Sequence, residues 1–159
     1  DGDLWDETFK SLSPEKAKDY MLNPGDILFA RSGATVGKTY LYRGGFDACY
    51  AGYLIRARCG EKLLPEFLFL YTKTSMYEAW KNSVYIQATI PNIGADKYSE
   101  LRVLVPPIEE QKEIIEAVNK KCESINNLQR ELKTQIEDLY KYRDAIISEA
   151  VTGQIDCPE

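Results

Sequence analysis

The sequence of 159 residues contains no histidine. This absence excludes Ser-His-Asp and Cys-His nucleophilic sites, zinc sites that use histidine, and a histidine general base. The four cysteines form no CxxC pair, which argues against a four-cysteine zinc site and favours free thiols in a reducing cytosol. No apolar run approaches the roughly 20 residues that span a membrane, and no signal peptide is visible. We therefore expect a cytoplasmic protein without a metal centre.

Positive charge is also scarce over the chain as a whole. Lys and Arg number 20 and Asp and Glu number 25, so the formal net charge is −5. This sum argues against a nucleic-acid-binding protein, which usually carries a basic surface. The charge is unevenly distributed, however: residues 31–107 hold ten basic and six acidic side chains, whereas the segments on either side are acidic. The middle segment therefore carries enough positive charge to bind nucleic acid. Because its excess of basic over acidic residues is modest, we expect this chain alone to bind weakly.

Residues 1–107 have the mixed pattern of an α+β domain. Ser13-Pro14-Glu15 is a plausible helix start, and the Asn-Pro-Gly-Asp turn at 23–26 precedes a short apolar run. In the segments that follow, glycines mark the ends, and residues that favour strands occupy the interiors. The pattern predicts strands at 27–30, 36–42, 49–59 and 101–105, a helix at 64–80, and an extended or loop segment at 83–91.

After Pro106-Pro107 the pattern changes to that of one long helix. Residues 108–151 contain neither proline nor glycine, and apolar residues recur in heptad steps. Such a helix outreaches the domain before it, so its apolar seam needs another helix, from a partner or from a second copy. Two polar residues interrupt the seam. They are either defects that the helix pairing tolerates or residues that set the register of that pairing. The predicted pairing positions are Ile115, Val118, Cys122, Ile125, Leu132, Ile136, Leu139 and Ile146; Cys122 has the register of a small core residue.

The segment 32–39 approaches the P-loop pattern GxxxxGK[ST]. Ser32 replaces the first glycine, and a β pattern follows Lys38 where a P-loop would begin a helix. Two other interpretations remain: a structural turn between two strands, or a turn whose donors meet a phosphate backbone or base edges. The candidate contacts for that last interpretation are Arg31, Ser32, Gly33, Thr35, Lys38, Thr39 and Tyr40.

A second polar segment, 82–93, is rich in amides and hydroxyls. Asn and Gln can pair bidentately with adenine. Its candidate contacts are Gln87, Thr89 and Asn92. An ordinary surface loop is the alternative.

Three segments together resemble a known family. Residues 23–29 with 31–38 are similar to the GDIL…R.G..GK segment of target-recognition domains. Residues 104–115, with Pro106-Pro107 and Glu110-Gln111, resemble the PP..EQ..I boundary between such a domain and a spacer helix, and 144–153 resembles the end of that helix. The family is the specificity subunit of type I restriction-modification systems.

The resemblance implies a non-catalytic DNA-recognition module. In this family two recognition domains each read half of a split double-stranded DNA target, and two antiparallel spacer helices hold them apart. The subunit binds methyltransferase subunits and, in the full complex, restriction subunits, which leaves S-adenosylmethionine and ATP to the partners and no cofactor to this chain. The chain corresponds to one such unit, either an excised half or a natural half-subunit that pairs with itself.

We therefore predict an α+β fold, a globular mixed α/β target-recognition domain followed by one long C-terminal coiled-coil helix. The expected divisions are a recognition domain at 1–107, incomplete at its N-terminus, a spacer helix at 108–153 and a tail at 154–159. A coiled-coil interaction scaffold without direct DNA readout is the alternative function.

Overall fold

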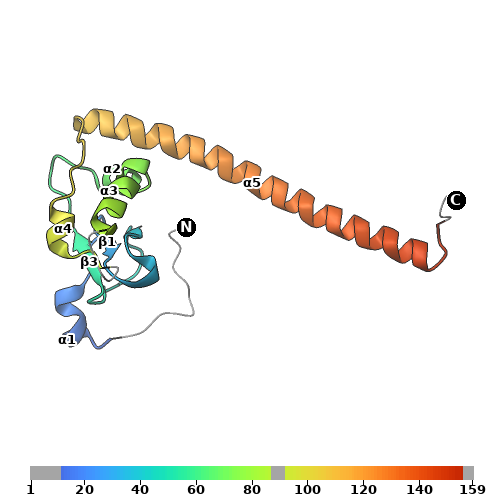
Figure 1. Ribbon diagram of the computed structural model, residues 1–159, viewed down its shortest axis with the longest axis horizontal. Helices are drawn as coiled ribbons and strands as arrows, with labels where there is room; N and C mark the ends of the chain where they lie inside the picture. The colour runs from blue at the N-terminus through green and yellow to red at the C-terminus, as the bar shows by residue number, and fades with distance from the viewer. Residues whose placement is uncertain (1–11, 87–91, 156–159) are drawn as a thin grey trace. The chain divides into compact units, whose positions relative to one another are not determined.

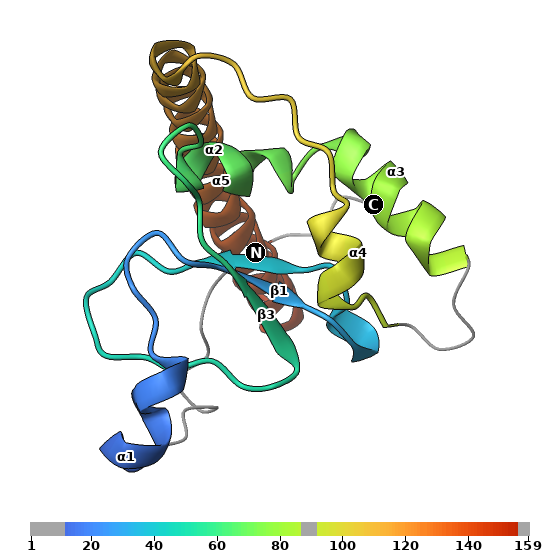
Figure 2. The same ribbon diagram turned by 90° about the vertical axis from the view of Figure 1, so that its left-hand side faces the viewer.

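The computed structural model describes residues 12–86 and 92–155, with side chains for all of these except 85 and 86. Its packing divides the chain into two units, residues 1–115 and 116–159. The first unit carries a small sheet and several short helices, and the second continues the long helix (Figures 1 and 2). The elements in chain order are α1 Pro14–Ala17, η2 Lys18–Tyr20, β1 Ile27–Ala30, η3 Gly33–Thr35, β2 Thr39–Leu41, β3 Leu54–Ala57, α2 Pro65–Tyr71, α3 Ser75–Ile86, α4 Ala95–Ser99 and α5 Ile108–Val151.

The sheet has three antiparallel strands in the order β2-β1-β3. Phe29 of β1 pairs with Thr39 of β2 and with Ile55 of β3. Successive side chains of a strand point to opposite faces, so these three residues lie on one face of the sheet. The central strand β1 is buried along its whole length, as the apolar run predicted.

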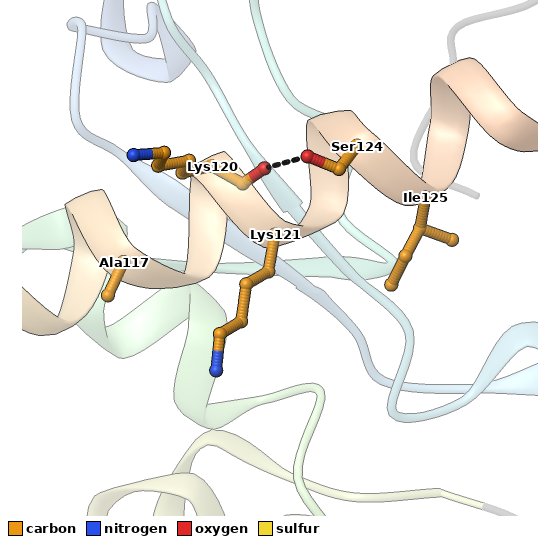
Figure 3. Close-up of a pocket in the computed structure, with 5 residues that line it drawn as sticks. All are labelled: Ala117, Lys120, Lys121, Ser124 and Ile125. Carbon is orange, nitrogen blue, oxygen red and sulfur yellow. Dashed lines mark hydrogen bonds between the residues drawn. The ribbon is translucent and has the colours of Figure 1, made fainter.

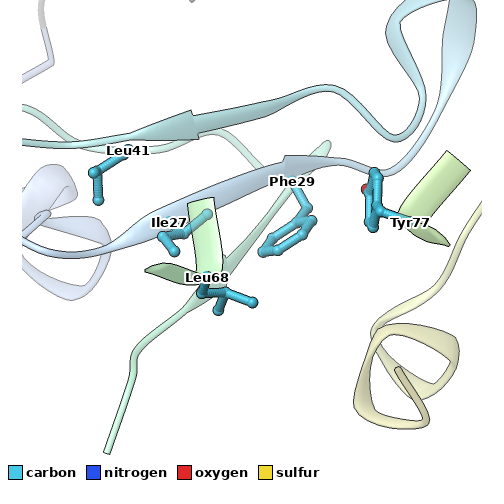
Figure 4. Close-up of a cluster of buried hydrophobic side chains, with 5 residues drawn as sticks. All are labelled: Ile27, Phe29, Leu41, Leu68 and Tyr77. Atoms are coloured by element: carbon cyan, nitrogen blue, oxygen red, sulfur yellow. The ribbon is translucent and has the colours of Figure 1, made fainter. Parts of the chain in front are cut away.

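The main core lies between that face of the sheet and the helices. Ile27, Phe29 and Leu41 from the strands meet Leu68 of α2 and Tyr77 of α3, and all five are buried (Figure 4). Trp80 and Tyr98 extend the cluster, because the Tyr98 ring lies 4.7 Å from Phe29 and 5.4 Å from Trp80. A smaller cluster on the other face joins Leu28 to Leu22 and Tyr42. The sheet is therefore covered on both faces.

The predicted helix at 64–80 is wrong in one respect, because the chain forms two helices there. Hydroxyl groups compete with the helical hydrogen bonds at the break. The Thr72 hydroxyl donates to the Phe69 carbonyl and the Thr74 hydroxyl donates to the Tyr71 carbonyl. Thr74 also accepts from the Tyr77 N–H and so caps α3.

Four other sequence predictions need correction. Helix α3 continues to Ile86, so residues 83–86 are helical and not extended. The strands β2 and β3 occupy only parts of 36–42 and 49–59. Residues 101–105 form no strand: Leu101 and Val103 pack on the main core, but the segment pairs with no other strand. The helix α4, which the sequence did not predict, precedes this segment.

The first turn of α5 is fixed to the globular unit by Gln111. This side chain is 0% exposed. Its carbonyl oxygen accepts from the Leu64 N–H at 2.9 Å, and its amide nitrogen donates to the carbonyls of Lys62 at 2.9 Å and Pro106 at 2.7 Å. One buried amide therefore ties the start of the long helix to the segment that leads into α2.

Candidate nucleic-acid interface

The loop between β1 and β2, residues 31–38, is closed by two backbone hydrogen bonds. The Gly37 N–H donates to the Ala30 carbonyl at 2.8 Å, and the Ala30 N–H donates to the Lys38 carbonyl at 2.9 Å. Within the loop, η3 Gly33–Thr35 forms a single tight turn. The loop is therefore a short, structured hairpin connection, and β2 follows it directly. A P-loop lysine would open a helix here, so the nucleotide-binding interpretation fails.

Gly37 is required by the geometry of this loop. Its φ is +79°, a conformation that other residues rarely adopt. A Cβ at this position would also lie 2.2 Å from Cδ of Lys81. Gly33 has φ +78° too, but space around it is open. Both glycines therefore serve the turn, and Gly37 in addition allows α3 to approach the loop.

Two tyrosines hold the ends of the loop from the helical side. The Tyr77 hydroxyl of α3 donates to the Gly37 carbonyl at 2.8 Å, and the Tyr98 hydroxyl of α4 donates to the Ala30 carbonyl at 3.4 Å. Burial, reinforced by neighbouring Tyr98, raises the pKa of Tyr77 far above its usual value, so its hydroxyl stays protonated as a donor. The loop is thus supported by buried aromatic residues and keeps its outer side free.

The second candidate segment lies directly beside this loop. Asn92 pairs with Ser32 in an isolated antiparallel bridge, and the N–H of the fully buried Ile93 donates to the Arg31 carbonyl at 2.8 Å. The tertiary structure therefore joins two polar segments that are sixty positions apart in the sequence. Gln87 and Thr89 lie outside the described residues.

The predicted contact residues differ in their accessibility. Ser32, Gly33, Thr35, Lys38 and Asn92 are exposed, and Arg31 and Tyr40 are half-buried.

The prediction that Thr39 contacts a ligand needs correction. Thr39 is only 7% exposed, and its hydroxyl forms a hydrogen bond of 2.7 Å with the Thr72 hydroxyl. Its role is to join β2 to α2, so we remove it from the candidate contacts.

The basic side chains at this surface are available for a ligand. Among the described residues, Arg31 and Lys38 have no carboxylate within salt-bridge distance. No group of acidic residues and cysteines with the arrangement of a metal site occurs in the described part of the chain. The surface thus offers hydroxyl, amide and cationic donors, which is the chemistry that meets phosphates and base edges.

Asp26 and Arg58 form the ion pair that stabilises the start of β1. Asp26 is 1% exposed, and its carboxylate accepts from the Arg58 guanidinium at 2.7 and 2.9 Å and from the Asn23 N–H at 2.9 Å. Burial alone would raise the pKa of Asp26, but these hydrogen bonds outweigh it and hold the pKa below its ordinary value. The motif residue Asp26 therefore has a structural role.

Sequence reasoning missed the supporting residues of this region. Tyr77 falls within the helix predicted at 64–80, and nothing in that helical pattern reveals that its hydroxyl reaches the loop. Tyr98 fell in a segment for which no element was predicted. Gln111 is part of the PP..EQ..I boundary motif. Its place after Glu110 in that motif was the one sequence signal for its role. Each role depends on a partner distant in the sequence.

The helix α5 beyond residue 115 presents a row of exposed apolar side chains. Leu132 is 48% exposed and Leu139 is 65% exposed. Cys122 is exposed as well, so it is not a core residue of this chain. Other exposed members of the predicted seam are Ile125, Ile136 and Ile146.

The hollow at the start of this stretch is lined by one helix alone. Its residues are Ala117, Lys120, Lys121, Ser124 and Ile125, and the Ser124 hydroxyl donates to the Lys120 carbonyl (Figure 3). An open surface of this kind encloses no small ligand. Over the part of the chain that the structure covers, no helix has the length and apolar character to cross a membrane.

Comparison with known proteins gives the family. The family described as "Type I restriction modification DNA specificity domain" matches residues 6–138. The chain belongs to this family. The resemblance found in the three sequence motifs is therefore confirmed, and the motifs of the specificity domain can be placed: the GDIL segment forms β1, and the PP..EQ..I segment starts α5.

Related specificity subunits come from bacteria and archaea. The StySPI specificity subunit of Salmonella potsdam is 26% identical over 149 residues, and the EcoKI specificity subunit of Escherichia coli K12 is 25% identical over the same length. In both cases the match covers 92% of this chain and 32% of the relative. The MjaVIII specificity subunit of Methanocaldococcus jannaschii is 23% identical over 135 residues. This specificity domain chain thus spans about a third of the length of these relatives.

A solved structure supports the fold. It comes from work on the complex assembly and conformational transition of the type I R-M system, and it matches with a TM-score of 0.70 at 22% identity. The match covers 82% of this chain and 31% of the other. A mixed α/β specificity domain with a small sheet and one long C-terminal helix is the fold of this chain.

Proposed function

We propose that this chain is a non-catalytic, sequence-specific DNA-recognition module that reads one half of a bipartite target. The observation that carries the proposal is the juxtaposition of the loop 31–38 with exposed Asn92, which the Asn92–Ser32 bridge and the hydrogen bond from buried Ile93 to Arg31 hold beside the loop. The loop 31–38 and the segment of Asn92 were each predicted from their own hydrogen-bond donors. Together their exposed residues form one polar strip. Membership of the DNA specificity family supports the same conclusion.

The strip divides into two kinds of contact. Arg31 and Lys38 carry the positive charge and contact phosphates, which fixes the position of the domain on the duplex. Ser32, Thr35 and Asn92 offer uncharged donors and acceptors, which suit base edges. Gln87 and Thr89 remain proposed base contacts from the same segment as Asn92.

The long helix is proposed to form a coiled coil with a second spacer helix. Exposed aliphatic residues at heptad spacing, among them Leu132 and Leu139, support this role because such a row is stable only when another helix covers it. The recognition domain (1–107) would then sit at one end of the spacer (108–153), and a second half-subunit or a second copy would supply the other. Methyltransferase subunits, and restriction subunits in the full complex, are the proposed further partners.

The test is the salt dependence of DNA binding by the complex of this chain with methyltransferase subunits. We expect Arg31→Ala and Lys38→Ala each to weaken binding and to lower the slope of log affinity against log salt by about 0.9, because each removes one phosphate contact. Lys18→Ala is the matched control, since Lys18 is exposed on η2. Unchanged affinity and slope for both variants would remove the loop from the interface.

The interaction scaffold remains the second candidate function, favoured by the exposed face of α5. It predicts that the assembled complex binds DNA equally well with or without an intact loop 31–38. A mobility-shift assay with methyltransferase subunits present separates the two functions.

A further inference from the structure

A second group of cations lies beside the proposed interface, where α2 packs on β2. The ammonium nitrogen of Lys73 is 4.4 Å from the centre of the Phe69 ring, and the guanidinium carbon of Arg43 is 5.8 Å from the same centre. These two charges therefore lie within about 10 Å of each other, roughly one Debye length at about 0.1 M salt. Lys38 contributes a third charge, because it directly precedes Thr39, whose hydroxyl accepts from the Lys73 ammonium, and its charge acts on Lys73. We call these residues, with Phe69, the Phe69 cation cluster.

The position of Lys73 is determined by a chain of hydroxyl groups. The Thr72 hydroxyl uses its proton toward the Phe69 carbonyl at 2.7 Å, so in its contact with Thr39 it acts as acceptor. Thr39 therefore donates to Thr72, and its own oxygen is left to accept from the Lys73 ammonium at 3.4 Å. An ammonium group has three donors. The two others of Lys73 remain for a ligand.

The cluster holds like charges together without compensation. Among the residues that the structure describes, Lys73, Arg43 and Lys38 have no carboxylate within salt-bridge distance. Burial, and then the charge of Lys38, lower the pKa of Lys73 from its ordinary value. All three basic residues are nevertheless exposed. Repulsion between these like charges costs free energy in the isolated protein. An anion that binds among them offsets that cost.

We propose that the Phe69 cation cluster is a phosphate-binding site for the DNA backbone, formed by Lys73 and Arg43 together with Lys38. The proposal rests on the function proposed above and extends that interface from the loop 31–38 along β2. It assigns phosphate contacts to Lys73, in the turn between α2 and α3, and to Arg43, which follows β2, two segments outside the recognised sequence motifs.

The geometry favours a nucleic-acid backbone over a single anion. Lys38 is the last residue of the proposed DNA-contacting loop, and Arg43 follows β2, the strand that lies at one edge of the sheet. Lys38 and Arg43 therefore flank β2 on its two sides in the chain, and a DNA strand presents phosphates at regular intervals to such separated charges. An acidic protein surface is the rival occupant.

The test measures binding of the complex of the full 159-residue chain with methyltransferase subunits to a fluorescent DNA duplex over a series of salt concentrations. Lys73→Met and Arg43→Met remove one charge each and retain an apolar stem on Phe69. We expect each to lower the salt slope by about 0.9, and the double variant to lower it by about twice as much. Lys73→Arg restores the charge and should bind like the wild-type chain.

Lys18→Met is the control for net charge, because it removes one exposed charge on η2. Thermal unfolding of each variant checks that the domain is intact. A wild-type slope in both Lys73→Met and Arg43→Met would overturn this inference and leave the proposed function standing, and binding of an acidic partner would then become the explanation. If Arg31→Ala and Lys38→Ala also left the affinity and the salt slope of the complex unchanged, the proposed function itself would fail, and this inference with it.

Discussion

Gln111 offers the sharpest test of how the long helix is joined to the globular unit. Replacing it with alanine removes one acceptor and two donors from a position with 0% exposure. The Leu64 N–H and the carbonyls of Lys62 and Pro106 then lose their partner. An unsatisfied buried polar group costs about 1–3 kcal/mol. A cost of about 1 kcal/mol for each of these three groups gives a total of about 3 kcal/mol for Gln111→Ala.

Gln111→Glu distinguishes docking from a simple helix-end effect. An acidic residue in the first turn of a helix ordinarily stabilises it by about 0.3–1 kcal/mol, and α5 already carries Glu109 and Glu110 there. At this position, however, a carboxylate oxygen would face the two carbonyls that now accept from the amide. We therefore expect Gln111→Glu to destabilise the protein at neutral pH, which is the opposite sign.

The assay is urea unfolding followed by tryptophan fluorescence, since Trp80 packs against Tyr77 and Tyr98 in the core. Protein concentration is held fixed, because self-association would shift apparent stability. Gln135→Ala, on an exposed position of the same helix, controls for helix propensity. A Gln111→Ala midpoint equal to that control, together with a stable Gln111→Glu variant, would refute the docking role.

Three further predictions concern the loop, the ion pair and the spacer. Tyr77→Phe removes the donor to the Gly37 carbonyl, so we expect a loss of about 1–2 kcal/mol and faster hydrogen exchange at Gly37, whereas unchanged exchange would contradict the clamp. Because the folded-state pKa of Asp26 lies below its ordinary 3.8, its contribution to stability is complete above that value and is lost as the pH falls through the folded pKa; Asp26→Asn should lack this acid-dependent loss in unfolding measurements. Leu132→Lys should abolish self-association in sedimentation equilibrium while Thr134→Lys, off the seam, should not, and a monomeric wild-type chain at high concentration would exclude self-pairing.

Local pattern was enough to identify several elements. The apolar run from Ile27 to Ala30 predicted a buried strand, because four consecutive apolar residues between turn signals are typical of a strand buried on both faces and too short for most helices. The absence of proline and glycine after Pro107, with aliphatic residues at heptad steps, predicted the long helix. Sequence motifs also identified the family. These features depend on residues close together in the chain.

Local pattern failed where a long-range partner decided the outcome. Residues 101–105 have an apolar strand pattern, yet Leu101 and Val103 pack on the core without a neighbouring strand to pair with. The helix predicted over 64–80 divides because hydroxyl groups at Thr72 and Thr74 satisfy backbone groups at the break. The same residue types occur within intact helices, so composition could not give the position of the break.

The candidate site shows the same division most clearly. Residue types identify the side chains whose chemistry suits contact with DNA, because charge and donor groups belong to the side chains. Folding then selects which of them share a surface: it places Asn92 beside Ser32, buries Thr39 against Thr72, and gathers Arg43 and Lys73 on Phe69. The physical reason is that a binding surface is defined by contacts between distant segments, and those contacts are fixed by burial of the core beneath them.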